Sequence, residues 1–163
     1  MPYSLCEEEV KYRLISHRGN IEGKSEKLEN NPGYIFDAIM AGYEVEIDLR
    51  LINGRWYLGH DIPQYEVGEG FIYDLASREK IWTHIKNVEA LSAVTGDKRY
   101  ISWNYFWHQS DDYTITSKNY IWAYPGKKLV KNSICVLPEI ANYDTIEVKE
   151  CLGVCSDYVG LYK

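Results

Sequence analysis

Two histidines and two carboxylates are the residues of this sequence whose types and spacing point most directly to chemistry. They lie in three short polar clusters, which are His17-Arg18, Glu46-x-Asp48 and His60-Asp61. Glu46 and Asp48 are two residues apart, so in an extended strand they share one face, with Cα atoms roughly 6–7 Å apart. Carboxylates that close repel each other unless a positive group lies between them. A divalent cation held by oxygen ligands would supply it, and neutralisation by Arg50 or a lysine is the alternative.

The two histidines suit proton transfer, because histidine titrates near neutral pH. One histidine would be weak support, whereas His17 and His60 each end a predicted strand and each precede a polar residue. Arg18 offers a planar fork of donors for a phosphate group, and Lys86 offers a second positive charge. This combination indicates a site for a phosphate ester, with His17 and His60 as its acid and base.

A strand must carry the two carboxylates. In residues 44–51 (EVEIDLRL), apolar and charged side chains alternate with a period of two. Such a strand presents an apolar face and a charged face. In a surface strand the charges would face water, and in a βα barrel they would face the lumen. The strand-end positions of the histidines favour the barrel, because functional groups gather at the carboxyl ends of parallel strands.

The other elements have recognisable boundaries. Asn31-Pro32 is expected to begin a helix that ends at Gly42, and Asn53-Gly54 predicts a tight turn. Further helices are expected after residue 87 as far as Gly96 and at 142–152. The remaining predicted strands are 13–16, 80–87, 99–104, 114–117, 119–126, 133–139 and 153–160, with a short one before Gly59.

Strands that alternate with helices favour a parallel sheet. The chain has 163 residues, and an eight-fold barrel usually needs about 250. We therefore expect an α/β fold: one compact domain over residues 1–163, an abbreviated TIM-type βα barrel with several crossover helices shortened or missing.

Composition excludes some classes of function. The net charge of −6 argues against a nucleic-acid partner, which requires clustered Lys and Arg. The start of the sequence has no basic and apolar leader pattern and no apolar run spans a membrane, so the expected location is the cytoplasm. Cys6, Cys135, Cys151 and Cys155 are expected to be thiols, because no second pair completes a metal site. Aromatic residues make up 14%, which suits either a core or a sugar site. His108, in the segment 106–113, either lines the pocket or belongs to a polar loop.

Several motifs together resemble the glycerophosphodiester phosphodiesterase family. They are ISHRG (15–19), Glu29-Asn30, Ala38-Ile39 with Gly42, EIDL (46–49) and GHD (59–61). Their order and spacing agree over roughly residues 14–61, and IWTHIKN and VCSDYV resemble later strands of the family. The combined pattern is specific, whereas HRG or GHD alone would not be.

The resemblance implies a TIM-barrel relative, of the phospholipase-C-like superfamily, that cleaves phosphodiesters with Mg²⁺ or Ca²⁺. It assigns His17 and His60 as general acid and base, Glu46 and Asp48 as metal ligands and Arg18 as a phosphate ligand. In that family a neighbouring hydroxyl of the substrate is thought to attack phosphorus, which gives a cyclic phosphate that water then opens.

The sequence departs from the family in two respects. His84 stands where the family usually carries a glutamate metal ligand, so His84 and Glu139 are both candidates for that position. The chain is also short, which makes a small-molecule phosphodiester such as a sugar or polyol phosphate as plausible a substrate as a glycerophosphodiester. The alternatives are a metal- and phosphate-binding protein without turnover, and a lyase that stops at the cyclic phosphate.

Overall fold

The structure is a computed structural model that describes residues 11–77 and 79–163. Its strands are β1 Arg13–His17, β2 Glu44–Ile52, β3 Arg55–Leu58, β4 Tyr65–Val67, β5 Ile81–Ile85, β6 Asn104–Phe106, β7 Tyr113–Ile115, β8 Ile121–Ala123, β9 Ser133–Val136 and β10 Gly153–Ser156. Its α-helices are α1 Pro32–Met40, α2 Glu69–Ser77, α3 Val88–Gly96 and α4 Thr145–Glu150. The 3₁₀ turns are η1 Lys98–Tyr100, η2 Pro138–Ile140 and η3 Val159–Tyr162.

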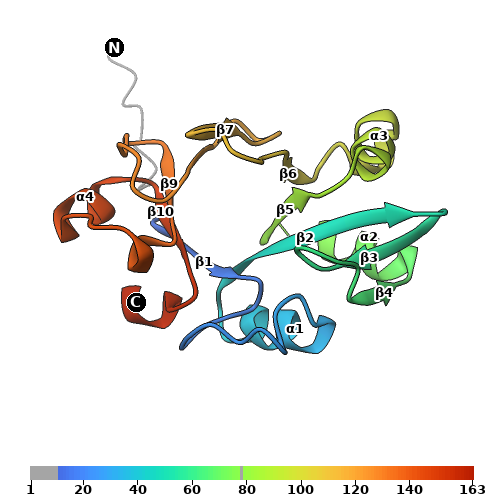
Figure 1. The fold of residues 1–163 in the computed structure, drawn as a ribbon, viewed down its shortest axis with the longest axis horizontal. Coiled ribbons are helices and arrows are strands. Elements are labelled where there is room, and N and C mark those ends of the chain that lie inside the picture. The colour runs from blue at the N-terminus through green and yellow to red at the C-terminus, as the bar shows by residue number, and fades with distance from the viewer. Residues whose placement is uncertain (1–10, 78) are drawn as a thin grey trace, which may run out of the picture.

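One curled sheet contains these strands, and the helices lie around its outside (Figure 1). Its parallel part runs in the order β6-β5-β2-β1-β10-β9-β8, and β7 adds to β8 in antiparallel orientation. A hairpin of β3 and β4 extends from the far end of β2. The predicted α/β class with a parallel sheet is confirmed.

The sheet does not close into a barrel. In the part of the chain that the structure describes, β6 and β7 share no strand ladder, and a seam separates them. Ser117, just after β7, spans the seam: its N–H donates to Tyr105 O (2.8 Å) and its Oγ donates to Trp103 O (2.7 Å). The expected barrel is therefore shortened further than the sequence indicates, to a curled sheet with one open seam.

Local sequence signals explain several boundaries. The Asn31 side chain accepts hydrogen bonds from Gly33 N and Tyr34 N, and Pro32 is the first residue of α1, as predicted. Gly42 follows α1 with a φ of 95°. Asn53 and Gly54 both have positive φ in the turn between β2 and β3, which is the geometry of a type I′ hairpin.

Other boundaries were predicted wrongly. Residues 99–104 are not a strand: the Asp97 side chain accepts from Arg99 N, which starts η1 instead, and β6 begins only at Asn104. The helix expected at 142–152 is shortened to α4, which Asp144 caps. The later strands are shorter than predicted, and neither α2 nor β4 was predicted.

Two apolar layers position the site. Val45, Ile47 and Leu49, on the outer face of β2, pack with buried residues of α1, α2 and α3. On the inner face, Trp82, Phe106 and Trp122 pack together with aliphatic residues of β1 and β9 and with Cys155 of β10. Aromatic side chains thus fill space both inside the curl and in the outer layer, where Trp56, Tyr100 and Trp103 are buried, and this favours a role in the core over a sugar site.

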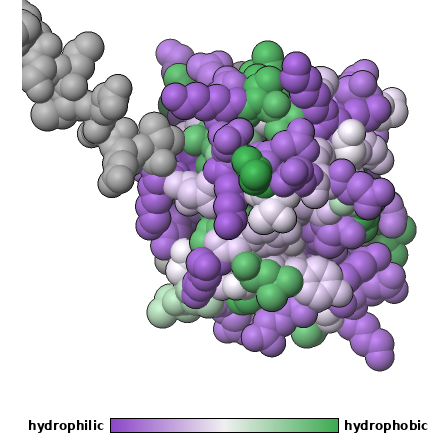
Figure 2. Space-filling view, turned by 90° about the vertical axis from the view of Figure 1, so that its left-hand side faces the viewer, coloured by the Kyte–Doolittle hydropathy of each residue, from purple (hydrophilic) through white to green (hydrophobic). Residues whose placement is uncertain are grey.

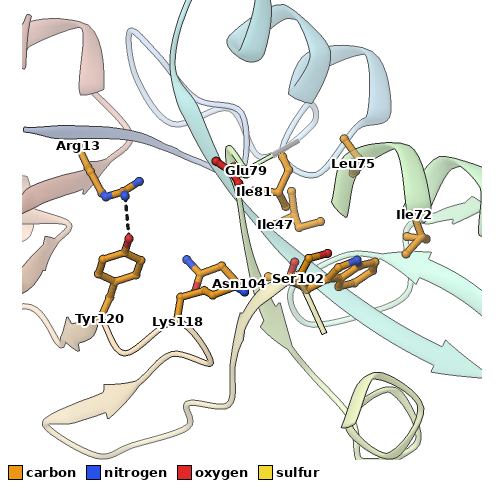
Figure 3. A pocket seen from close by; sticks show the side chains of 12 residues that line it. Arg13, Ile47, Ile72, Leu75, Glu79, Ile81, Ser102, Asn104, Lys118 and Tyr120 are labelled. Carbon is orange, nitrogen blue, oxygen red and sulfur yellow. Dashed lines mark hydrogen bonds between the residues drawn. The ribbon is translucent and has the colours of Figure 1, made fainter. Parts of the chain in front are cut away.

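A polar tie closes the amino end of the strands. Arg13 Nη1 donates to Glu44 Oε1 (2.9 Å), Arg13 Nη2 donates to Tyr120 Oη (2.7 Å), and Trp82 Nε1 donates to Glu44 Oε2 (2.6 Å). Beside it lies a cavity of about 360 Å³, which Arg13 and Tyr120 line together with the apolar side chains of Ile47, Ile72 and Leu75 (Figure 3). This end of the sheet is stabilised by an ion pair beneath the aromatic layer.

Two further predictions concern cysteines and membranes. Cys135, Cys151 and Cys155 are buried free thiols, as expected, while Cys6 and the N-terminal residues considered for a leader lie outside the described ranges. Among the residues that the structure describes, no helix is both long enough and apolar enough to span a bilayer.

Candidate active site

The turn after β1 is the first part of the site. β1 ends at His17, and Arg18 and Gly19 follow with left-handed backbone at φ values of 56° and 95°. This conformation is uncommon for arginine and costs roughly 1–3 kcal/mol. Hydrogen bonds from Arg18 N to Glu46 O (3.0 Å) and from Asn20 N to His17 O (2.9 Å) hold it. The turn thus brings the Arg18 side chain next to the carboxylates of β2.

The two carboxylates of β2 are buried. Glu46 is 2% exposed and Asp48 is fully buried. Because they alternate with Val45, Ile47 and Leu49, which face the helices, they project to the inner side of the curl. The surface-strand alternative for this segment is therefore wrong. Asn30, also at positive φ, binds Asp48 twice: its Nδ2 donates to Asp48 Oδ2 (2.9 Å) and its Oδ1 accepts from Asp48 N (2.9 Å).

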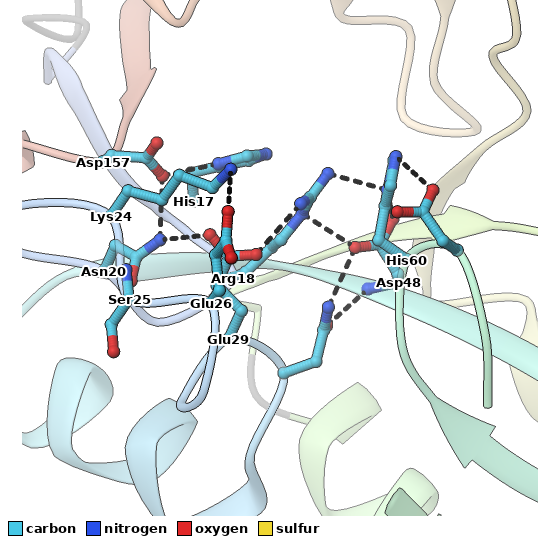
Figure 4. A network of polar contacts seen from close by, with 12 residues as sticks. His17, Arg18, Asn20, Lys24, Ser25, Glu26, Glu29, Asp48, His60 and Asp157 are labelled. Carbon is cyan, nitrogen blue, oxygen red and sulfur yellow. Dashed lines mark hydrogen bonds and ion pairs between the residues drawn. The ribbon is translucent and has the colours of Figure 1, made fainter. Parts of the chain in front are cut away.

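His60 enters the site from the loop after β3. Gly59 N donates to Asp48 O (3.1 Å), and the Arg50 guanidinium binds the carbonyls of both Gly59 and His60. His60 Nδ1 lies 3.0 Å from Asp48 Oδ1 and 2.7 Å from Arg18 Nη2 (Figure 4). Since an arginine can only donate, Nδ1 accepts when it binds Arg18 and donates when it binds Asp48, and it cannot do both at once.

His84 lies beside Asp48 because β5 pairs with β2 in a register that opposes these two residues. Its Nε2 donates to the carbonyl of His108 (2.8 Å), and its ring stacks on Phe106. A neutral His84 therefore carries its lone pair on Nδ1. That lone pair faces Asp48 Oδ1 at 3.2 Å and Glu46 Oε1 at 3.8 Å.

His17 is paired with a residue that sequence reasoning missed. His17 Nδ1 lies 2.6 Å from Asp157 Oδ1, which also accepts from Asn20 Nδ2 (2.8 Å) (Figure 4). His17 Nε2 lies 3.9 Å from Glu46 Oε2. Asp157 follows β10, and β1 and β10 are neighbours in the sheet. The segment VCSDYV contained Asp157, but no local pattern singled it out.

The pKa values of the two buried carboxyl groups are shifted in opposite directions. Burial, together with the neighbouring Asp48, raises the pKa of Glu46 well above its ordinary value. Burial would also raise the pKa of Asp48, but the neighbouring imidazoles of His60 and His84 and the charge of Arg18 hold that pKa well below its ordinary value. Burial lowers the pKa of His84, which favours its neutral form. By themselves these groups favour an ionised Asp48 next to a protonated Glu46.

The remaining predicted residues lie at different distances from this cluster. Lys86 Nζ is 3.4 Å from His60 Nδ1 and 3.9 Å from Asp48 Oδ1, and burial lowers its pKa. Glu139 instead binds the end of β10, where its carboxylate accepts from Ser156 Oγ (3.0 Å) and Asp157 N (2.8 Å). Its contacts support Asp157, and its role as a metal ligand stays a prediction.

A divalent cation fits the residues present. Glu46 Oε2 is buried and has no hydrogen-bond partner in residues 11–77 and 79–163. Asp48, His60 and His84 each offer one ligand atom, and these atoms lie within 4.8 Å of one another. The Nδ1 lone pair of His84, which faces both carboxylates, can bind a metal ion between them. Carboxylate oxygens suit Mg²⁺ and Ca²⁺, and the imidazole ligands also suit softer divalent ions.

A cavity of about 460 Å³ opens above the cluster. It is lined by His17, Arg18, Glu46, His60, His84 and Lys86, and by His108, which therefore contributes to the pocket. Six of the eight residues predicted for the site thus border one cavity, Asp48 lies in direct contact with three of them, and Glu139 does not line it. A cavity this size admits a small ester.

One solved structure has a similar fold, whereas comparisons by sequence find no match. No family model matches the chain, and no curated protein does. Among solved structures, it is similar to the crystal structure of a glycerophosphodiester phosphodiesterase from Thermotoga maritima, with 16% sequence identity and a TM-score of 0.50. The match covers 93% of this chain and 97% of the other. At this identity the likeness shows the fold alone, and any chemistry must be argued from the residues of the site.

Proposed function

We propose that this chain is a metal-dependent phosphodiesterase. The observation that supports it most directly is the convergence of three electron-rich groups, since the Nδ1 lone pair of His84 faces the carboxylates of Glu46 and Asp48. In the proposed site these three residues would hold Mg²⁺ or Ca²⁺, with His60 close beside them. Such a cation, when bound, stabilises negative charge on the phosphoryl oxygens.

His17 is the base in this proposal. Asp157 accepts the hydrogen of His17 Nδ1, which leaves the lone pair on Nε2, toward the cavity. Nε2 takes a proton from the attacking hydroxyl, either that of water or a neighbouring hydroxyl of the substrate. A P–O bond forms to that oxygen, and the P–O bond to the leaving alcohol breaks.

His60 is the acid. In the form that acts as the acid, the ring carries two hydrogens: Nδ1 donates to Asp48 Oδ1, and the hydrogen on Nε2 passes to the oxygen of the leaving alcohol, which leaves a neutral imidazole. Arg18 and Lys86 are the proposed phosphate ligands, because both positive groups border the cavity on the same side as His60. The geometry therefore supports a lone pair on His17, which can accept a proton, and a hydrogen on His60, which can be donated. The proposed reaction needs both.

The test is turnover of glycerophosphodiesters, followed by phosphorus NMR, with and without Mg²⁺, Ca²⁺ or Mn²⁺ after EDTA treatment. We expect metal-dependent release of a phosphomonoester, and a rate loss of about 10²–10⁴ in His17→Gln and His60→Gln. A cyclic phosphate as the final product would indicate a lyase. Undiminished rates in both folded variants would contradict the assignment.

One observation favours a second candidate, a binding protein without turnover. The Arg18 guanidinium is already engaged by Glu29 (3.1 Å), Asp48 (3.0 Å) and His60 (2.7 Å). An arginine bound this way has few donors left for a phosphate. Metal and phosphate binding by calorimetry, with no product from any ester tested, would support this candidate.

A further inference from the structure

The cavity has two chemically different sides. The side from β1, β2, β5 and the loop after β3 carries the charged cluster. The side from β8, β9 and the turn after β9 carries apolar groups, which are Trp122, Tyr124, Pro125, Val136, Leu137 and Ile140. We call these six residues the apolar wall. A substrate with two small polar alcohols would gain no binding energy from such a wall, because its hydroxyls would lose hydrogen bonds to water there.

The apolar wall extends from the buried centre to solvent. Trp122 and Val136 are buried, and Trp122 packs on Phe106, which stacks on His84. At the mouth, Tyr124 is 45% exposed and Ile140 is 68% exposed. A single exposed isoleucine is ordinary on a protein surface. Here it continues an apolar surface that begins at the proposed metal ligands, which is the arrangement of a ligand site.

A strained residue supports the wall. Leu137 has left-handed backbone, with φ of 46° and ψ of 56°, at the start of η2. Its N–H donates to Cys155 O (2.7 Å), and its carbonyl accepts from Ile140 N (3.1 Å). Bulky residues adopt this conformation at a cost of roughly 1–3 kcal/mol, and such positions concentrate at functional sites. The strained turn is what places both Leu137 and Ile140 on the cavity.

We propose that the substrate is an amphiphilic phosphodiester whose phosphate lies on the charged side and whose apolar alcohol lies along the wall. This inference rests on the proposed function and adds the substrate class. The apolar arm leaves through the mouth past Ile140, so its length is not limited by the cavity. The shared chemistry is a phosphodiester with one alkyl chain, whether free in water or held in a bilayer.

The test uses glycerol phosphodiesters whose second alcohol is methyl, butyl or octyl, all below their micelle concentrations. We expect kcat/KM to rise by about threefold to fourfold for each methylene that reaches the wall, and to level off beyond Ile140. Ile140→Ser should flatten the dependence on chain length. Binding of the matching alkyl phosphates, by calorimetry, gives a readout that does not require turnover.

Ile146→Ser is the matched control. Ile146 is 62% exposed, similar to Ile140, but lies on α4. The face of the molecule that carries α4 is mainly hydrophilic, with apolar side chains in small separate groups (Figure 2). This variant should keep the full chain-length dependence of the parent protein.

The outcomes separate the two proposals. Equal kcat/KM for all three esters, with turnover that still requires His17, would overturn the amphiphile inference and keep the phosphodiesterase. No turnover, with alkyl phosphates that bind more tightly as the chain grows and lose this trend in Ile140→Ser, would overturn the enzyme and support the apolar arm. A higher rate on a hexadecyl ester in phosphatidylcholine vesicles than on the free octyl ester would assign the bilayer as the source, and the reverse would assign free amphiphiles.

Discussion

His17 and Asp157 are separated by 140 positions in the sequence, yet their side chains are 2.6 Å apart. Burial would raise the pKa of Asp157, but the hydrogen bond with His17 lowers it below its ordinary value. An ionised Asp157 keeps the hydrogen of His17 on Nδ1. It is therefore a positioning residue, one that controls which nitrogen of His17 is free for chemistry.

Asp157→Asn should leave the fold intact and slow turnover by about 10²–10⁴. Asn can donate to Nδ1, which moves the ring hydrogen to Nε2 and removes the base. Because the substituted group does not border the cavity, KM should change little. Steady-state kinetics and a melting curve test this, and a loss confined to KM would argue against the positioning role.

Glu46 predicts a dependence of stability on pH. Its pKa is raised in the folded state, so the folded protein binds this proton more tightly than the unfolded chain does. Without divalent ions, stability should therefore fall as the pH rises from about 4.3, the ordinary glutamate value, through the raised pKa. Glu46→Gln should remove this fall and melt at a higher temperature than the parent in EDTA at about pH 8.

Melting curves across pH, with EDTA and then with Mg²⁺ or Ca²⁺, test the Glu46 prediction. Added metal should stabilise the parent but not Glu46→Gln, because a ligand that binds the folded state alone raises its stability. Asp48→Asn serves as the contrast, since the pKa of Asp48 shifts in the opposite direction and its loss removes one of the two carboxylates that pair with Arg18. Identical pH profiles for parent and Glu46→Gln would contradict the buried-pair account.

At the level of elements, the loop between β3 and β4 is the most constrained support of the site. Gly59 has a φ of 147°, and a Cβ there would collide with Ile62 O and lie 2.9 Å from Gln64 N. The backbone of Gly59 and His60 is also held by Arg50. The position of His60 therefore depends on a glycine that has no room for a side chain.

Gly59→Ala should displace His60 and reduce kcat by at least about tenfold, since misplacement by about 1 Å is enough to cost rate. Gly54→Ala is the matched control. Gly54 also has positive φ, but a Cβ there would meet nothing within 4 Å. The control should lose about 1–2 kcal/mol of stability from backbone strain and keep its kcat. Equal kcat losses in both variants would show that the close contact at Gly59 is unimportant.

The elements also show what sequence reasoning can reach. The alternation in β2, the Asn31-Pro32 start of α1 and the Asn53-Gly54 turn depend on neighbouring residues, and each was predicted. The pairing of His17 with Asp157 and of His84 with Asp48 depends on which strands become neighbours, and no local pattern contains that information. The error at 99–104 has a local cause, because the Asp97 cap on η1 outweighed a strand-like pattern.

At the level of the whole molecule, the two ends of the curled sheet have separate tasks. The carboxyl ends hold the proposed site, whereas the amino ends hold the ion pair of Arg13 and Glu44 beneath Trp82. The polar contacts at the amino ends should contribute to stability and not to chemistry, as is general for this end of βα barrels.

Glu44→Gln should lower the free energy of unfolding by about 1–3 kcal/mol, because it leaves a partly buried Arg13 without its counter-charge. Glu66→Gln is the control: its ion pair with Arg55 is mostly exposed, and exposed pairs contribute about 0–1 kcal/mol. Urea denaturation of both variants gives the comparison. A Glu44→Gln protein as stable as the control would contradict a structural role for the tie.

The aromatic packing inside the curl has an optical consequence. The rings of Trp82 and Trp122 lie 5.8 Å apart, and Trp122 contacts Phe106, which stacks on His84. Two indoles this close couple their electronic transitions, so near-ultraviolet circular dichroism should carry a signal specific to the folded, curled sheet. Because the chain of rings ends at a proposed ligand, the emission of Trp122 should respond to what binds there. The protein thereby carries an intrinsic, label-free reporter of its own site.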